Sequence, residues 1–165
     1  MALYAKLLSL SQTFVSPPDL PTFLALRAPH AVHSWGHNHL VSKNPTLASL
    51  DNAAFEAHLH STGRYLESLG GELTDIIIDG HKRKAMLRMS YFLKPKGSDE
   101  TVENDLVWIL TFTGEGEVEG GVDGILIKES MEFIDATASG RLAIVLREMH
   151  GKLDDDIKGG ISITI

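Results

Sequence analysis

Near its C-terminal end the chain carries a stretch, Asp123–Asp135, in which apolar and polar residues alternate. A period of two along the chain predicts a β-strand rather than a helix. One side of this strand would carry Ile125, Ile127, Glu129, Met131 and Phe133. The other side would carry Lys128, Ser130 and Glu132 between Leu126 and Ile134. A carboxylate is costly to bury among apolar neighbours unless it is protonated, paired or hydrogen-bonded. The strand is therefore either an ordinary amphipathic edge or a support that directs an acid into a pocket.

The overall composition predicts one globular domain that binds neither nucleic acid nor membrane. A chain of 165 residues, 43% of them apolar, is long enough to bury a core. The formal net charge of −7 argues against nucleic acid and anionic lipid, because phosphate affinity comes from Lys and Arg. The absence of Cys excludes disulfides, thiolate catalysis and Cys-based zinc sites. No apolar run is long enough to cross a membrane and no signal peptide is evident, so we expect a soluble, cytoplasmic protein.

The N-terminal half of the sequence predicts three helices and one strand. Apolar residues at helical spacing predict a helix over residues 3–14, and Ser16–Asp19 resembles a capping box for a second helix that stops around Pro29. Val32–Leu40 is predicted as a strand, and Asp51–Gly70 as a third helix with its cap and its terminating glycine. The predicted strand carries four ring side chains on one side: His33, Trp35, His37 and His39.

The C-terminal half predicts strands joined by turns. Glu72–Asp79 and Arg83–Leu93 flank the dipeptide Asp79-Gly80, which is typical of hairpins. Val102–Thr113 is a further strand, and the stretch at 123–135 is the last one. The remaining segments are turns at 94–99 and 114–121 and a closing helix, Ala138–His150, with Leu142, Val145, Leu146 and Met149 directed inward.

This order of elements predicts an α+β protein with a curved antiparallel sheet. Helices from the N-terminal and middle parts of the chain would cover one side of the sheet and make a cone with an apolar bottom and an open mouth. We expect a single domain over residues 1–150 and a tail over 151–165. The final Ile-Ser-Ile-Thr-Ile of the tail is compatible with an edge strand, with pairing across a dimer, or with a loose end.

Four segments together carry a family pattern. They are Ala-Leu-Arg-Ala-Pro-His-Ala-Val-His at 25–33, Asp-Ile-Ile-Ile-Asp at 75–79, Asn-Asp-Leu-Val-Trp-Ile-Leu-Thr-Phe-Thr at 104–113 and Lys-Glu-Ser-Met-Glu-Phe-Ile-Asp at 128–135. Their order and spacing resemble the SnoaL-like branch of the nuclear-transport-factor-2-like fold. Within that branch the chain is most similar to fungal meroterpenoid isomerases and related secondary-metabolite cyclases. The resemblance extends over roughly residues 2–150.

The resemblance implies a cofactor-free pocket that catalyses proton transfer, usually in a homodimer packed through the sheet. It places the family's strand-end acid on Glu132, with Asp135 following, and its strand-start histidine on His33. The family's acidic position in the 104–113 segment falls on Asp105. Arg88 stands where relatives often carry a polar residue, commonly His. Because the same fold also hosts dehydratases and non-catalytic binding modules, the fold alone does not give the function.

Glu132 and His33 are the predicted proton-transfer residues. Burial in an apolar cone raises the pKa of a carboxyl group toward working pH, although Glu132 could instead be a surface residue paired with Lys128 or Arg88. His33 could act as a base or as a hydrogen-bond donor, or it could be a structural histidine. Asp105 and Arg88 are the residues predicted to orient this pair and to balance its charge.

Trp35 would provide an apolar wall for a substrate, unless it is simply a core residue. His37, Trp108 and Ser90 complete the predicted substrate-binding set. His37 and His39 would lie about 7 Å apart on one side of the predicted strand, a spacing that can bind a metal. The order of elements does not suit a metal-binding cupin, however, so we predict neither a metal nor a cofactor, and a metal enzyme that uses these histidines is the third alternative.

The sequence thus predicts a cofactor-independent isomerase or cyclase that rearranges a small polycyclic secondary metabolite by general acid/base catalysis. A dehydratase of the scytalone-dehydratase type is the nearest alternative, because the same pair of groups can eliminate water. A non-catalytic ligand-binding or dimerisation module is the alternative from a different class, and it requires no unusual pKa at either residue.

Overall fold

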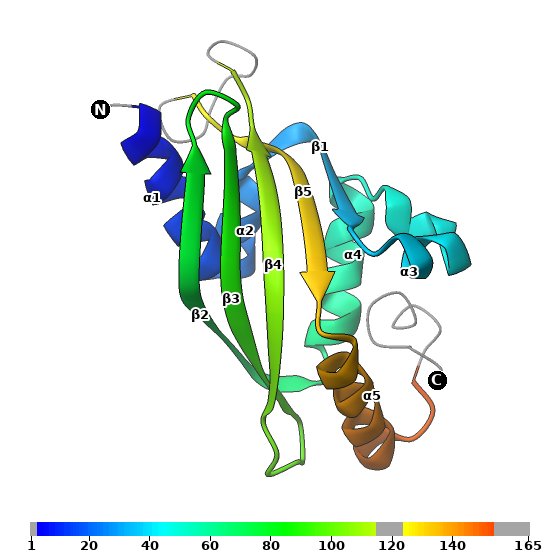
Figure 1. Ribbon diagram of the computed structural model, residues 1–165. Coiled ribbons are helices and arrows are strands. Elements are labelled where there is room, and N and C mark those ends of the chain that lie inside the picture. The colour runs from blue at the N-terminus through cyan, green and yellow to red at the C-terminus, as the bar shows by residue number, and fades with distance from the viewer. Residues whose placement is uncertain (1–2, 115–123, 154–165) are drawn as a thin grey trace.

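A computed structural model of the protein describes residues 3–114 and 124–153, and Figure 1 shows how their elements are arranged. The helices are α1 (Leu3–Val15), α2 (Leu20–Ala25), α3 (Asn38–Lys43), the 3₁₀ helix η1 (Pro45–Ala48), α4 (Asn52–Gly63) and α5 (Ala136–His150). The strands are β1 (Arg27–Trp35), β2 (Leu66–Asp79), β3 (Lys84–Pro95), β4 (Val102–Phe112) and β5 (Ile127–Ile134).

The five strands form one mixed sheet in the order β1-β5-β4-β3-β2. Strands β2 to β5 are an antiparallel meander, as the sequence predicted. Strand β1 runs parallel to β5 at one edge of the sheet. The alternating stretch at 123–135, which contains β5, therefore lies between β1 and β4. The α+β class and the curved, helix-covered sheet are confirmed.

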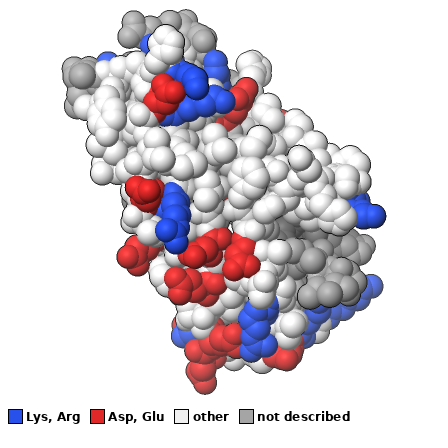
Figure 2. Space-filling view, in the orientation of Figure 1, with Lys and Arg blue, Asp and Glu red and all other residues white. Residues whose placement is uncertain are grey.

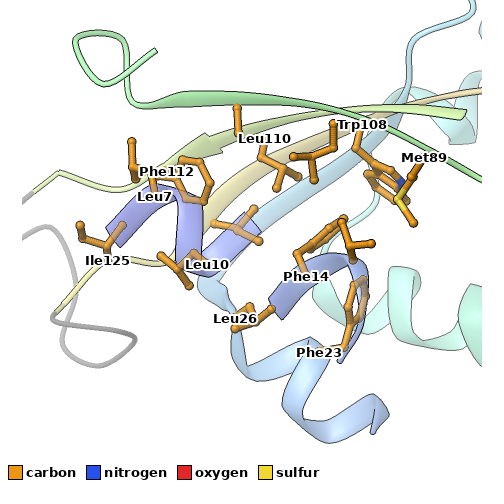
Figure 3. Close-up of a cluster of buried hydrophobic side chains, with 14 of the residues drawn as sticks. Leu7, Leu10, Phe14, Phe23, Leu26, Met89, Trp108, Leu110, Phe112 and Ile125 are labelled. Atoms are coloured by element: carbon orange, nitrogen blue, oxygen red, sulfur yellow. The ribbon is translucent and has the colours of Figure 1, made fainter. Parts of the chain in front are cut away.

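Helices α1, α2 and α4 lie against one face of the sheet, which we call the inner face (Figure 1). The core forms where these helices meet the sheet. Leu7, Leu10 and Phe14 of α1 and Phe23 of α2 point toward Met89, Trp108, Leu110 and Phe112 of the strands (Figure 3). Burying side chains of this size contributes about 1.5–3 kcal/mol each. The inner face of the sheet therefore carries most of the stability, and any site on it is held in a packed environment.

The opposite, outer face of the sheet is covered by no helix among the described residues. It carries an apolar row of directly paired residues, in which Met131 lies opposite Ile109, Ile109 opposite Met86, and Met86 opposite Ile77. Three of these four side chains are exposed. The space-filling view of this face shows uncharged atoms between two groups of charged side chains (Figure 2). A row of exposed apolar side chains bounded by charges is a feature of surfaces that bind a partner.

Side-chain caps explain where three of the helices begin. Asp19 accepts a hydrogen bond from the backbone N–H of Thr22 at the start of α2. The cap of the second helix is therefore Asp19, the last residue of the predicted capping box, rather than Ser16, its first residue. Asp51 caps α4 as predicted, and Asp135 caps α5 immediately after β5. The cap at Asp135 fixes the turn that leads away from the end of β5.

The first strand begins and ends earlier than predicted. Arg27 to Pro29 belong to β1 rather than to the second helix, because Arg27 pairs with Ile127 of β5. The strand ends at Trp35, and the next residue is Gly36, where an added Cβ would lie only 2.1 Å from the ring of Phe133, so a side chain does not fit at this position. The predicted strand over Val32–Leu40 is thus wrong beyond Trp35, where the chain turns into α3.

The third helix is shorter than predicted, and the strand after it is longer. Helix α4 ends at Gly63, and β2 pairs with β3 from Leu66 to Asp79. Tertiary pairing here overrides the helical spacing of the apolar residues. Gly71 does not end a helix; it lets α1 approach β2, because an added Cβ would lie 2.9 Å from the carbonyl oxygen of Val15. The inward direction predicted for Met149 of α5 is also wrong, since this side chain is exposed.

Strand β5 contains a β-bulge at Lys128. Thr111 of β4 pairs with Glu129 and Phe112 pairs with Ile127, so two residues of β5 span one step of β4. The bulge changes which residues face inward, because Ile127 and Ser130 are both buried whereas Met131 is exposed. The predicted alternation holds only after the bulge, where the side that bears Glu132 is the inner one.

Two predictions fall outside the described residues. Apart from Gly114, the turn predicted at 114–121 lies there, and so does the edge strand predicted at the end of the tail. The boundary of the domain near residue 150 stays a prediction, although α5 does end at His150. None of the described helices is both long enough and apolar enough to cross a membrane.

Candidate active site

A chamber lies between the inner face of the sheet and helices α4 and α5. Its volume is about 150 Å³. Every strand of the sheet contributes to its wall, which is mostly apolar. Among the lining residues are Trp35, Phe55, His58, Tyr91, Trp108 and Glu132. The exposed side chain of Leu69 also borders the chamber, which marks the side where it meets solvent.

Glu132 is the acidic residue of this chamber wall. Its backbone pairs with Trp35 of β1 on one side and with Trp108 of β4 on the other. Paired residues share a face of the sheet, so the carboxyl group lies between two indole rings. Its side chain is 12% exposed. Burial raises the pKa of Glu132 to about 8, and the carboxyl group therefore keeps its proton near neutral pH.

His33 lies directly beside this carboxyl group but does not line the chamber. Its Nε2 atom is 3.8 Å from Oε2 of Glu132, and its Nδ1 atom is 3.1 Å from Oγ of Ser130. The ring is fully buried and packs against the rings of Trp35, Phe55 and Trp108. Burial holds the pKa of His33 well below its usual value. Both members of the pair are thus neutral near pH 7.

Two further ionisable side chains of the chamber were missed at the sequence level. His58 of α4 meets the ring of Trp35 edge to face, and burial lowers its pKa. Tyr91 of β3 is partly buried, and both burial and the charge of Glu132 raise its pKa. Tyr91 shares its side of the strand with Leu87 and Met89, so strand alternation was a usable signal. His58 carries no such signal, because it lies on a predicted helix two residues from His60, and residues at that spacing do not share a face.

Several buried polar atoms in the chamber wall or directly behind it have no hydrogen-bond partner among the described residues. They are Nε2 of His33, Nε1 of Trp108 and Oγ1 of Thr62. The indole N–H of Trp108 is close enough to the hydroxyl of Tyr91 to affect its pKa without making a hydrogen bond of normal geometry. Buried polar atoms normally have a partner. The wall next to Glu132 can therefore bind an oxygen atom of a ligand.

The structure brings together four of the eight predicted site residues. Glu132, His33, Trp35 and Trp108 are neighbours on the inner face. The other four residues lie elsewhere.

Arg88, Ser90 and Asp105 lie on the outer face, because alternation along β3 and β4 turns them away from the chamber. There the hydroxyl of Ser90 donates a hydrogen bond to Asp105. The sheet separates these three residues from His33 and Glu132, so Asp105 and Arg88 cannot orient the pair as the sequence suggested.

His37 and His39, which follow β1, lie outside the chamber. His37 is the residue before α3, and its Nε2 accepts a hydrogen bond of 2.9 Å from the backbone N–H of Ile134. His37 therefore ties α3 to the end of β5 and does not reach the chamber. His39 is exposed on α3, so the strand geometry that would have placed two imidazoles on one side does not exist. Within residues 3–114 and 124–153, no group of His, Asp and Glu side chains is arranged to hold a metal ion.

Comparison with known proteins identifies the fold. The sequence matches no family model and no curated protein. The structure is similar to that of PrhC from Penicillium brasilianum, with 18% identity, a TM-score of 0.74, and coverage of 96% of this chain and 98% of that one. It is also similar to the BvnE pinacolase from Penicillium brevicompactum, with 19% identity, a TM-score of 0.67, and coverage of 86% and 91%.

A third similar structure names the fold group. It belongs to a candidate SnoaL-like polyketide cyclase from Jannaschia, with 13% identity, a TM-score of 0.56, and coverage of 84% of this chain and 91% of that one. At such identities the likeness shows the fold. The protein has the SnoaL-like fold, and the resemblance inferred from its sequence is confirmed at that level.

Proposed function

We propose that the protein is a cofactor-independent isomerase or cyclase that rearranges a small polycyclic secondary metabolite, with Glu132 as the residue that transfers the proton. The observation that carries this proposal is the buried carboxyl group of Glu132, which faces an apolar chamber and keeps its proton near neutral pH. A binding module has no need of such a group, because an unpaired buried carboxyl group lowers stability. The proteins of similar structure include one called a pinacolase and one called a polyketide cyclase, which supports rearrangement chemistry.

The chemistry follows from the protonation state of Glu132. The protonated carboxyl group donates its proton to an oxygen atom of the substrate and acts as a general acid. The carboxylate that results then accepts a proton from a carbon atom of the substrate, which returns Glu132 to its starting state and shifts the position of a double bond or ring bond. His33 borders Glu132 at 3.8 Å and stabilises the carboxylate that forms in between.

The size of the chamber limits how the substrate can bind. A cavity of about 150 Å³ accepts a single six-membered ring, as shown by engineered cavities of this volume that bind benzene. We propose that one ring of the substrate enters beside Glu132, between Trp35 and Trp108. The remaining rings would lie at the mouth, near Leu69.

Turnover by a matched pair of variants tests this function. Purified protein is incubated with a panel of fungal polycyclic ketones and alcohols, and isomeric products are detected by mass spectrometry coupled to chromatography. We expect Glu132→Gln to lower the turnover of a converted compound by about 10²–10⁴-fold, the usual contribution of a general acid or base. Glu129→Gln changes the same residue type on the outer face of the same strand and should retain wild-type turnover. Equal turnover by both variants would exclude Glu132 as the proton-transfer residue, and binding without conversion would favour a binding module.

We also propose that the protein is a homodimer that packs through the outer face of the sheet. The exposed apolar row of Met131, Ile109, Met86 and Ile77 supports this arrangement. Native mass spectrometry should show two chains for the wild type and one for Met86→Glu. Ile144→Glu, at an exposed apolar position on α5, should remain dimeric. A monomeric wild type would refute the proposal. Cytoplasmic location stays a prediction from the sequence.

A further inference from the structure

A buried arginine lies behind the pair of Glu132 and His33. Arg27, the first residue of β1, is only 5% exposed, and its guanidinium group lies over the ring of Phe55 at 4.6 Å. Burial lowers the pKa of Arg27 to about 10, and no carboxylate within residues 3–114 and 124–153 forms an ion pair with its guanidinium group. A buried charge without a counter-ion is strongly destabilising. A residue placed at such a cost requires an explanation beyond packing.

The hydrogen bonds of Arg27 lead toward the active site. Its Nε donates to Oδ1 of Asn52 at 2.8 Å, and the amide of Asn52 donates to the carbonyl oxygen of Ala28. These bonds fix the plane of the guanidinium group. Its Nη1 then donates to Oγ of Ser130 at 2.8 Å, and the same oxygen is 3.1 Å from Nδ1 of His33. Arg27, Ser130, His33 and Glu132 thus form one continuous polar chain.

The direction of the hydrogen bonds in this chain is fixed at one end. An arginine can only donate, so the oxygen of Ser130 accepts from Arg27. Ser130 is 1% exposed, and its hydroxyl proton needs an acceptor. The atom in position to accept it is Nδ1 of His33. A neutral imidazole that accepts at Nδ1 carries its proton on Nε2, the atom that faces Oε2 of Glu132.

We propose that Arg27 and Ser130 are positioning residues that hold His33 as the neutral Nε2–H tautomer and direct this N–H at the carboxyl group of Glu132. The inference rests on the proposed function of Glu132 and goes beyond it. The backbone of His33 is bonded in both directions to Leu50 at 2.8 Å, which keeps the ring in place while Glu132 changes its charge. When Glu132 loses its proton, the Nε2–H group becomes a donor to the carboxylate. In the opposite tautomer, a lone pair would face the new negative charge.

The other ionisable groups around His33 agree with this assignment. Burial lowers the pKa of His33 most, and the charges of Arg27 on its own strand and of His58 from α4 lower it further, which keeps the ring neutral. Tyr91 from β3 and Glu132 from β5 are both protonated near neutral pH, since burial raises the pKa of each. Among the described residues, only the backbone of Ser130 and the ionised form of Glu132 favour the doubly protonated imidazolium, and burial outweighs the Ser130 backbone because the pKa of His33 is lowered overall.

Nitrogen NMR of the full-length protein, labelled with ¹⁵N-histidine, tests the tautomer directly. The chemical shifts of the two ring nitrogens distinguish the protonated one from the unprotonated one, and a His33→Gln variant identifies the signals of His33 among the eight histidines. We expect the wild type near neutral pH to show a neutral ring with its proton on Nε2. A proton on Nδ1, or on both nitrogens, would overturn the proposal.

Substitutions of the hydroxyl donor separate positioning from folding. Ser130→Ala should shift His33 toward the Nδ1–H tautomer and raise the titration midpoint of Glu132, followed by carbon NMR of its carboxyl group. Ser130→Thr keeps the hydroxyl group and should restore the wild-type tautomer. Ser34→Ala, next to His33 but at the outer-face groove, should leave both readouts unchanged. An unchanged tautomer in Ser130→Ala would contradict the role of Ser130.

The two proposals fail in different ways. If His33 carries the Nε2–H tautomer but Glu132→Gln turns over substrate at the wild-type rate, the proposed function fails and the assignment of the ring survives. If Glu132→Gln is inactive but His33 carries its proton on Nδ1, the function survives and the positioning role of Arg27 and Ser130 is wrong.

Discussion

Glu129 and Glu132 lie three residues apart on β5, and the sheet gives them opposite properties. Glu129 is exposed on the outer face, at a shallow groove with Val32, Ser34 and Met131. Glu132 lies on the inner face, where burial raises its pKa to about 8. Since both are glutamates of one strand, only the surroundings produce the difference. Chemical reactivity in this protein is therefore a property of the face of the sheet rather than of the residue type.

The same contrast holds for the sheet as a whole. Inner side chains of β3 and β4 are packed under helices, whereas many of their outer neighbours, such as Met86, Arg88 and Asp105, are exposed. Adjacent residues in a strand provide matched pairs, because they share backbone geometry and differ mainly in the face they occupy. Such pairs allow the contrast between the two faces to be measured.

The largest expected effect is the pH-dependent change in the free energy of unfolding caused by Glu132→Gln. The native pKa of Glu132, about 8, lies above its ordinary value of 4.5, so between these pH values the native state binds more protons than the unfolded state. The free energy of unfolding contributed by this group therefore falls as the pH rises. Glu132→Gln removes the effect and should gain stability relative to the wild type by several kcal/mol from about pH 5 to pH 8. Glu129→Gln, which changes an exposed side chain of the same strand, is the control in urea unfolding. A stability difference between Glu132→Gln and the wild type that does not vary with pH would contradict the burial of Glu132.

A slightly smaller effect is expected from truncation of a core side chain. Leu87 is fully buried, and Leu87→Ala should lower the free energy of unfolding by about 2–5 kcal/mol. Met86→Ala, at the next position but on the outer face, should cost no more than about 1 kcal/mol in the single chain. Urea unfolding at several protein concentrations measures both. A loss at Met86 as large as that at Leu87 would break the contrast, and its dependence on protein concentration would then reveal a second copy on this face.

The smallest effect concerns buried and exposed polar groups of β4. Asn104 is buried; it donates to Oγ of Ser139 at 2.9 Å and accepts from the backbone N–H of Asp135. Asn104→Ala leaves these groups unpaired and should cost about 1–3 kcal/mol. Asp105→Ala removes an exposed partner of Ser90 and should cost less than Asn104→Ala. Thermal unfolding of the two variants side by side is sufficient, and the reverse order would show that the outer face is not open to solvent.

Much of the fold was predictable from the sequence, because periodicity and caps are local signals. The meander from β2 to β5, the cap at Asp51 and the closing helix α5 all follow from patterns within a few residues. Where the prediction was wrong, a distant contact had overridden the local pattern. The strand predicted at 32–40 ends at Trp35, and the next residue, Gly36, packs against the ring of Phe133, which is almost one hundred residues away in the sequence.

The site was predictable only in part, for the same reason. Glu132 and His33 carry a signal in the sequence, since both are ionisable residues in apolar strands. The outward direction of Arg88 and Asp105 depends on which face the helices cover, and no local pattern determines it. Arg27 had no signal at all, because its role depends on Ser130, more than one hundred residues further along the chain.

Lys128 illustrates how the site depends on the number of residues in β5 as well as on their identity. The bulge at this position adds one residue between Ile127 and Glu129. Removing that residue would exchange the two sides of the rest of the strand, since side chains alternate with a period of two. Met131 and Phe133 would then face the chamber, and Glu132 would face solvent. A substitution at Lys128 can leave the site intact, whereas deletion of Lys128 would move the side chain of Glu132 from the inner face to the outer face of the sheet.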